Sequence, residues 1–440
     1  MQAVEQNQNQ VAAAEAIEPN GEPQPSVFKL DTDCWDEVLD CLSLEDVHSF
    51  GQTCKAFHRV TGKYFQWKYV SALAYCYEDG IYINDKRMDG FDEFVQQISF
   101  YGVTLNSAFH YVETNCKAEI KQLSFSDVDL NQDIKTIEKR LEKIDSLALL
   151  CCKFDEDIWQ TLFESCTNLK RLIFWTCIDE SFAWPVRKHP TLEHLELYTF
   201  GSFDGERIKL KNFFNQFPNL RSLQIDANVQ CDSQDLISAA NVDDMAIDMN
   251  KDIDTTISFL NDIHQRGFFK RLHLKWDWED GVPSAEQLLS LPGLVTLYIF
   301  PYGNENPEFP VLPSIKELGI SFCIGIPINT DAVATSFINL EQLFITGPHD
   351  LLPFIRRSAK LRDVEIAEFE GEALDIAALN KERKKLAGAR KVTIYVNERV
   401  YLATKWATTD TSLELIELKR QQSRDIVRPH SFWRRFRRLD

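Results

Sequence analysis

The sequence predicts an α/β solenoid, in which a curved parallel sheet lines the inside and helices cover the outside, preceded by a small three-helix unit. Three observations lead to this fold class. A short apolar frame recurs at nearly even spacing over most of the 440 residues, and the segments between frames have helical periodicity. In addition, residues 30–62 hold three helix-like segments that are too small to enclose a core of their own.

Residues 1–26 are rich in Gln, Asn, Ala, Glu and Pro, and they carry too few apolar side chains to repay the entropy of ordering. They contain no basic n-region and no apolar h-region, and no stretch of eighteen apolar residues occurs elsewhere. We therefore expect a disordered leader on a protein that is neither secreted nor membrane-bound and that resides in the cytoplasm, the nucleus or both.

The stretch DEVLDCLSLEDVHSFGQTCKAF, residues 36–57, has helical apolar spacing in short segments. Ser43 stands three residues before Asp46, a capping-box spacing that predicts the start of a second helix, and Gly51 is expected to end that helix. A third segment is expected to end at Gly62. The first helix is predicted from apolar residues at i, i+3, i+4 and i+7, which are Trp35, Val38, Leu39 and Leu42.

The gapless run from Leu30 to Val60 resembles the F-box family. The resemblance lies in the leading Leu, the aliphatic residues of the first helix, a Leu-Glu-Asp-Val centre, and Cys-Lys followed by an aromatic residue. It implies that residues 27–62 form an F-box whose helices bind the Skp adaptor of cullin-based ubiquitin ligases. The adaptor contacts that the resemblance implies are Leu30, Trp35, Val38, Leu39, Leu42, Leu44, Val47, Phe50, Cys54 and Phe57.

Two residues depart from the family pattern. Asp31 stands where members usually carry Pro, and Phe57 stands where they usually carry Trp, so we expect a changed entry turn and one changed adaptor contact. The alternative interpretation is an N-terminal helical cap that packs on the repeats and binds no adaptor. After it, residues 63–94 are predicted to be a helical linker, with the helix over 63–77.

From residue 120 onward one frame recurs: apolar, two mostly polar residues, apolar, one residue, apolar. Its mean spacing is about 24.5 residues, within the 20–29-residue range of leucine-rich repeats. With candidate terminal repeats around Ile98 and Ile416, the sequence predicts a solenoid of about 12–14 leucine-rich repeats over residues 95–420. The middle apolar residues of the frames fall at positions 123, 147, 172, 195, 223, 245, 272, 297, 318, 343, 364 and 392.

Leucine-rich repeats place Asn or Cys five residues after the middle position, where the side chain bonds the backbone as it leaves the strand. The residues at that position here include Cys152, Cys177, Asn228, Asn250, Cys323 and Asn397. Helices are expected between the strands, for example where Ile158, Leu162, Phe163 and Cys166 fit one helical face. Several cysteines thereby receive a structural role, as reduced and buried thiols.

Residues next to the middle leucine point away from the core, onto the concave face of the sheet. Aromatic and charged side chains alternate there, which is typical of interface hot spots. The alternative is a solvated sheet with a few exposed rings. The candidate substrate-binding residues are Arg171, Trp175, Tyr198, Asp226, Asp248, Lys275, Tyr298 and Phe300.

The chain ends in a basic tail, residues 421–440, whose last thirteen residues RPHSFWRRFRRLD carry five Arg against one Asp. One hypothesis is that residues 428–440 fold back over the acidic part of the concave face, near Asp226, Asp244 and Asp248. A flexible tail, a site for an anionic partner and a nuclear signal are the competing interpretations.

Composition limits the function. A net charge of -19, from 48 basic and 67 acidic residues, disfavours a general nucleic-acid binder. The eleven cysteines form no C-x-x-C pair, and no catalytic or cofactor-binding motif occurs, so we expect no metal, no cofactor and no catalytic site. The resemblance then implies a non-catalytic substrate receptor that binds the Skp adaptor, through it a cullin, and a protein substrate. The alternative is a leucine-rich-repeat scaffold or inhibitor outside the ubiquitin system.

Overall fold

The computed structural model describes residues 30–421 outside short gaps. The predicted leader, residues 1–26, and the predicted tail after Gln421 lie outside the described residues. Among the described residues, no helix has the length and apolar character needed to cross a membrane. The gaps are residues 70–73, 78–79, 84–85, 104, 117–118, 132–139, 177–187, 200–213, 227–241, 250–252, 278–283, 301–308, 321–328, 347–349, 368–372 and 409–412.

Three helices begin the described chain: α1 (Thr32–Leu39), α2 (Leu44–Gln52) and α3 (Lys55–Lys68). Asp31 caps α1, because its carboxylate accepts a hydrogen bond from the Cys34 amide at 2.8 Å. Ser43 caps α2 by accepting from the Asp46 amide at 3.0 Å, as its spacing predicts. The Asp46 carboxylate accepts from the Ser43 hydroxyl at 2.7 Å instead of completing the reciprocal capping box.

Two glycines do not end these helices, so that prediction was wrong. Helix α2 continues through Gly51, and α3 continues through Gly62. A Cβ atom on Gly51 would lie 2.5 Å from Thr61 Oγ1, and one on Gly62 would lie 2.4 Å from the ring of Phe94. Both glycines are therefore positions of close packing, where no side chain fits.

The linker is helical only at its start, where α3 continues to Lys68, and this corrects the helix predicted over residues 63–77. After α3 the described chain forms β1 (Ala74–Tyr77), β2 (Gly80–Ile83), β3 (Lys86–Arg87) and a 3-10 turn, η3 (Asp92–Phe94). Strands β1, β2 and β3 pair antiparallel in succession, and β1 also pairs parallel with β4. Aromatic and β-branched residues in β1 and β2 favour this hairpin over a helix.

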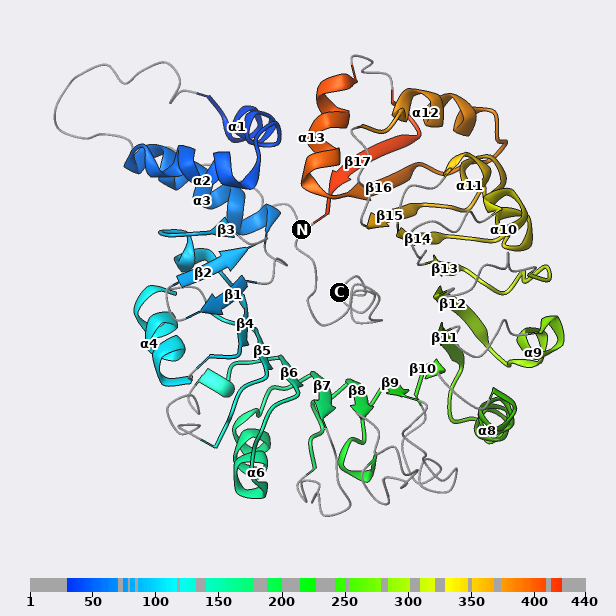
Figure 1. Ribbon diagram of the computed structural model, residues 1–440, viewed down its shortest axis with the longest axis horizontal. Coiled ribbons are helices and arrows are strands. Elements are labelled where there is room, and N and C mark those ends of the chain that lie inside the picture. Colours follow the sequence, from blue (N-terminus) through cyan, green and yellow to red (C-terminus); the bar gives the residue numbers. More distant parts are fainter. Residues whose placement is uncertain are drawn as a thin grey trace, which may run out of the picture.

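The remaining strands pair parallel in chain order and continue the same sheet. Figure 1 shows them lining the inside of a nearly closed ring, with the helices outside. The candidate terminal repeats around Ile98 and Ile416 both form strands of this sheet. These strands are β4 (Gln97–Tyr101), β5 (Gln122–Ser126), β6 (Ser146–Leu150), β7 (Arg171–Thr176), β8 (His194–Thr199), β9 (Ser222–Asp226), β10 (Asp244–Met249), β11 (Arg271–Asp277), β12 (Leu294–Phe300), β13 (Glu317–Ile320), β14 (Gln342–Thr346), β15 (Asp363–Ala367), β16 (Val392–Val396) and β17 (Ile416–Arg420).

Register follows the predicted frame over long stretches. The middle residues pair directly from Ile98 in β4 to Leu272 in β11. Shifts occur at β11–β12, where Leu274 pairs with Leu297, and at β15–β16, where Val364 pairs with Ile394. Because side chains alternate between the faces of a strand, these pairings still place core residues beside core residues.

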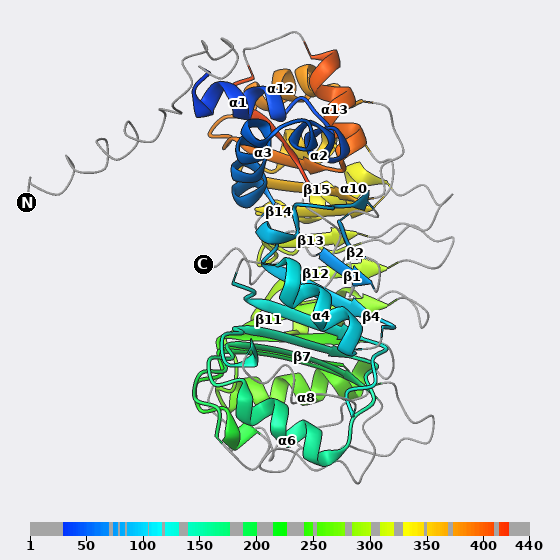
Figure 2. The ribbon, with the colours of Figure 1, turned by 90° about the vertical axis from the view of Figure 1, so that its left-hand side faces the viewer.

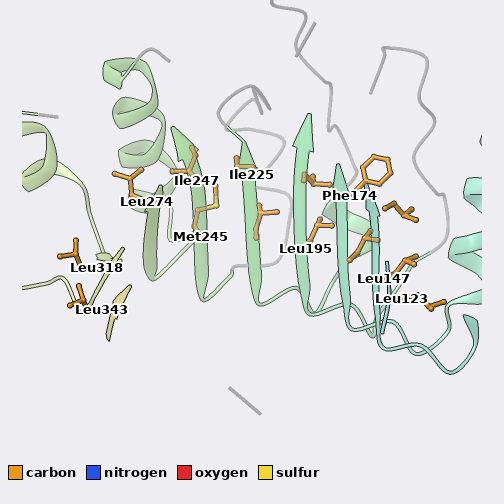
Figure 3. Close-up of a cluster of buried hydrophobic side chains, with 14 of the residues drawn as sticks. Leu123, Leu147, Phe174, Leu195, Ile225, Met245, Ile247, Leu274, Leu318 and Leu343 are labelled. Carbon is orange, nitrogen blue, oxygen red and sulfur yellow. The ribbon is translucent and has the colours of Figure 1, made fainter. Parts of the chain in front are cut away.

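The core lies between this sheet and the outer helices. Figure 3 shows side chains of successive strands, among them Leu147, Leu195 and Met245, on one side of the sheet. All three are at most 1% exposed. The outer elements are α4 (Leu105–Asn115), α6 (Glu156–Ser165), η4 (Phe214–Gln216), α8 (Ile253–Gln265), α9 (Ala285–Ser290), α10 (Thr330–Ser336), α11 (Leu352–Arg357), α12 (Ile376–Lys384) and α13 (Glu398–Ala407).

The two ends of the sheet are brought together. Figures 1 and 2 show helices α1–α3 beside α13 and β17. The amide of Leu44 in α2 donates to the carboxylate of Glu398 in α13 at 2.8 Å, across 354 positions of sequence. The three-helix unit therefore contacts the last repeat as well as the first strands.

Candidate functional site

The predicted adaptor contacts differ in exposure. Leu39, Leu44 and Val47 are 0–1% exposed and belong to the main core, so they support the helices from inside. Their expected role as direct contacts does not agree with this arrangement, because the apolar stripes of α1 and α2 face their own core. The contacts that remain exposed are Leu30 at 41%, Val38 at 44% and Cys54.

One aromatic residue from each of the three helices joins a common cluster. The ring centroids of Phe50 and Phe57 lie 4.1 Å apart, and Trp35 lies 5.8 Å from Phe50 and 5.6 Å from Phe57. Trp35 is buried, whereas Phe50 and Phe57 are partly exposed, as is Leu42. The phenylalanine at position 57 therefore keeps an aromatic ring where the F-box pattern has Trp.

The second departure, Asp31, begins the first helix. The hydrogen bond from the backbone of Cys34 lowers the pKa of the Asp31 carboxyl below its usual value. An ionised carboxylate at this end of α1 also interacts favourably with the helix dipole. The entry turn is thus changed in chemistry, yet it still starts the helix at the expected place.

The predicted concave residues whose side chains the structure describes lie on the sheet face opposite the outer helices. Leu172 and Phe174 of β7 belong to the main core, while Ile173 and Trp175, which alternate with them, join a separate apolar cluster with Tyr198. This alternation confirms the predicted face of the strand. The side chains of two candidates, Asp226 and Phe300, lie outside the described residues.

The described candidates form local groups. Trp175 and Tyr198, on β7 and β8, have ring centroids 5.9 Å apart, and Tyr198 accepts a hydrogen bond from the side chain of Gln224. Lys275 donates to Asp248 at 2.5 Å, which links β10 and β11. Further along the sheet, Tyr298 lies 6.3 Å from the ring of Phe344. Arg171, at the start of β7, is 7% exposed. The concave face thus carries an aromatic group, a charged pair and a second aromatic pair.

The hydrogen bonds of a buried polar chain on this face were not predicted from the sequence. His273 is 0% exposed; its Nε2 atom lies 2.7 Å from Asp244 and its Nδ1 atom 2.9 Å from Thr296. Arg271 also donates to Asp244 at 2.7 Å. The repeat frame places these residues on the concave face, but it does not show which of them pair across strands. Their mutual hydrogen bonds tie β10, β11 and β12 together.

The described cysteines divide between buried and exposed positions. Burial raises the pKa of Cys116, Cys152 and Cys166 to about 12, which keeps these thiols protonated. Cys152 Sγ donates to the Phe125 carbonyl at 3.3 Å, the structural role predicted for it. Cys34, Cys54 and Cys151 are exposed, contrary to the expectation of buried thiols.

The other predicted Asn and Cys positions lie outside the described residues, except Asn397, which caps α13. Its side chain accepts a hydrogen bond from the Val400 amide at 2.9 Å. Within the described part of the chain, no group of three or more His, Cys, Asp or Glu residues is placed to hold a metal ion.

Comparison with known proteins relates parts of the chain to a domain family and to a curated protein. The F-box domain model matches residues 27–68, which include all three helices and extend past the boundary predicted at residue 62. A curated protein of Arabidopsis thaliana, Receptor-like protein 7, is 29% identical over 103 residues. That match spans 22% of this chain and 11% of the relative, so the chain covers a small part of that protein.

Proposed function

We propose, from the premise that this chain is an F-box protein with leucine-rich repeats, that it is the substrate receptor of a Skp–cullin–F-box ubiquitin ligase. The F-box domain supports a role as the adaptor-binding subunit of such a ligase. The finer proposal is that the F-box binds a Skp adaptor and through it a cullin, while the concave face binds a protein substrate. The chain would then act in the cytoplasm, the nucleus or both.

One observation carries this proposal. The match to the F-box domain coincides with a three-helix unit that keeps two apolar side chains exposed, Leu30 just before α1 and Val38 within α1, although the inner faces of the helices are buried. Exposed apolar residues on a well-packed helical unit support docking of a partner protein. The chain itself would be non-catalytic, and it would accelerate ubiquitin transfer by holding a substrate near the charged enzyme.

Co-purification of the full chain with a Skp adaptor tests the proposal. We expect the wild type to bind, and we expect the double variant Leu30→Asp, Val38→Asp to lose binding, because charge is placed on exposed positions of the F-box. The matched control is Leu289→Asp, since Leu289 is 62% exposed on the distant helix α9. Substitutions at Val47 are unsuitable, because a buried charge there would unfold the helices.

Failure of the wild type to bind any Skp adaptor would overturn the proposal and favour a scaffold or inhibitor. Binding that survives the double substitution would show that the docking surface lies elsewhere. For the substrate, we expect proteins that accumulate after depletion of this chain to be cleared again by the wild type. The double variant Trp175→Ala, Tyr298→Ala should fail to clear them, whereas Leu289→Ala should succeed.

A further inference from the structure

A single arginine joins the last strand of the repeat array to the F-box. Arg420, the final residue of β17, donates from Nη1 to the Tyr69 hydroxyl at 2.8 Å and to Glu398 at 2.9 Å. Its Nη2 donates to the carbonyl oxygens of Leu42 at 2.7 Å and Asp40 at 3.2 Å. One guanidinium therefore contacts two F-box residues and Tyr69, which directly follows the F-box, and all three lie more than 350 positions away in sequence.

The charges have the sign that the two helix ends require. The carbonyls of Asp40 and Leu42 lie just beyond the carboxyl end of α1, where a cation is favourable. Glu398 Oε1 accepts from the amide of Leu44, the first residue of α2, where an anion is favourable. The last repeat thus supplies a cation to one F-box helix and an anion to the next.

Arg420 occupies a position on the core side of the sheet. It is in register with Val396 of β16, which is 0% exposed. At the end of the sheet its side chain is 12% exposed and its guanidinium lies 5.0 Å from the centre of the Tyr401 ring. A guanidinium with so little exposure needs hydrogen-bond acceptors, and three of the four that it uses belong to the F-box and to Tyr69, directly after it.

The F-box is also held from the opposite side. Lys86 of β3 donates to Glu45 of α2 at 2.6 Å, and the side chain of His48 lies 2.8 Å from the Asp89 carbonyl. Within the F-box, Tyr64 donates to Asp40 at 2.6 Å and so fixes the segment that Arg420 contacts. The F-box therefore bridges the first and last strands of the sheet.

We propose that Arg420 and Glu398 form a latch that fixes the F-box against the last repeat, and thereby sets the direction of the adaptor-binding helices relative to the concave face. Both are positioning residues, because neither belongs to the predicted adaptor or substrate contacts. The latch itself is independent of the proposed function. Its consequence for the ligase, a fixed spacing between adaptor and substrate, rests on that function.

Hydrogen–deuterium exchange of the full chain tests the latch directly. In Arg420→Met and in Glu398→Ala we expect amides of residues 40–46 to exchange about tenfold faster, since each variant removes hydrogen bonds of charged groups. Arg420→Lys keeps the charge but not the planar fork, so it should give an intermediate rate. Residues 245–275, in the middle of the array, should exchange as in the wild type.

The matched control is Arg357→Met, which removes an arginine that pairs with Asp331 at 2.8 Å in a neighbouring repeat. It should leave residues 40–46 unchanged. Unchanged exchange there in Arg420→Met would overturn the latch. An equal acceleration over residues 245–275 would overturn it as well, because Arg420 would then act on the stability of the whole chain.

Adaptor affinity separates the latch from the proposed function. If the wild type binds a Skp adaptor, Arg420→Met should weaken binding about tenfold, because fewer molecules hold the helices in the competent arrangement. Leu30→Asp with Val38→Asp should abolish binding without changing exchange in residues 40–46. A wild type that does not bind would refute the receptor proposal alone, and the exchange measurement would still decide the latch.

Discussion

The repeat array and the junction between the F-box and the last repeat are stabilised in different ways. In the array, each strand pairs with its neighbours in the chain and buries aliphatic side chains such as Leu195, Leu223 and Met245 beside one another. At the junction, charged groups of Arg420 and Glu398 meet backbone groups and a hydroxyl from distant parts of the sequence. The array is apolar and repetitive, whereas the junction is polar and depends on few residues.

This difference has a consequence for how each region responds to change. A buried aliphatic residue contributes about 1.5–3 kcal/mol, and many residues of the array share that role. Interactions in a solenoid are largely between nearest neighbours, so loss of one leucine is felt mainly by adjoining repeats. Loss of Arg420 would leave acceptors on both sides of the junction without this donor, and among the described residues no other side chain donates to the carbonyls of both Asp40 and Leu42.

Arg383 is a fully buried charged residue in the otherwise apolar core of the array. Its substitution should lower the free energy of unfolding more than the other substitutions proposed below. This side chain of α12 is 0% exposed. It donates to carbonyl oxygens only, at 2.7–3.1 Å, and burial lowers its pKa to about 10. These acceptors belong to Ile355, Ser358, Ala359, Leu361 and Arg390.

Arg383→Met should lower the free energy of unfolding by about 3–5 kcal/mol, because the carbonyls at the end of α11 lose their donors in a buried place. Urea denaturation followed by circular dichroism measures this loss. Lys384→Met is the control, since Lys384 is exposed on the same helix. Equal effects of the two substitutions would show that the array does not depend on a polar cap.

The contrast between the repetitive array and the junction also explains which parts of the fold could be predicted from the sequence. The array was predictable because each repeat buries the same few side chains, so the period of the fold is a period of the sequence. Its regular face was predictable too, as Ile173 and Trp175 illustrate. The strands after α3 were misassigned as part of a helical linker because their short apolar runs fit helix and strand alike, and only the pairing of β1 with β4 decides between them.

The junction could not be predicted for a different reason. Arg420 looks like an ordinary charged residue at the end of a strand, and its partners at positions 40, 42 and 69 give no local signal. The adaptor contacts were predicted as a set, but burial divides that set. The helical spacing identifies which residues of α1 are apolar. It does not show which of them are buried, because burial depends on the rest of the chain, and in the structure Leu39 is buried while Val38 is exposed.

A substitution at Gly51 in the F-box should lower stability by an amount between those expected for Arg383 and Tyr69. Gly51→Ala would place a Cβ atom 2.9 Å from the ring of Phe91, which is 0% exposed, and 2.5 Å from Thr61 Oγ1. We expect a loss of about 2 kcal/mol of stability in the F-box helices, because overpacking outweighs the better helix propensity of alanine. Exchange of the α2 amides measures it, and Ser49→Ala, an exposed site on the same helix, is the control. A gain in stability would show that Gly51 is not a packing position.

The smallest expected effect concerns Tyr69 at the junction and depends on pH. Burial raises the pKa of Tyr69 to about 12 from 10.0, although the charge of Arg420 opposes the shift. Below pH 10 the phenol is protonated in both the folded and the unfolded chain, so its contribution is fully present. Between pH 10 and 12 the unfolded chain releases the proton while the folded chain retains it, and stability falls.

Tyr69→Phe removes both this titration and the acceptor for Arg420. At pH 8 the variant should be less stable by about 1 kcal/mol, because one hydrogen bond to a charged group is lost. At pH 11 the wild type should have lost about 1.4 kcal/mol through Tyr69, so the difference between the two chains should vanish or reverse. Urea denaturation at both pH values measures this, and Tyr101→Phe, at a ring that is 47% exposed, is the control. A difference that stays constant from pH 8 to pH 11 would show that the Tyr69 phenol ionises as readily in the folded chain as in the unfolded one. The F-box would then not bury Tyr69 at this end of the array.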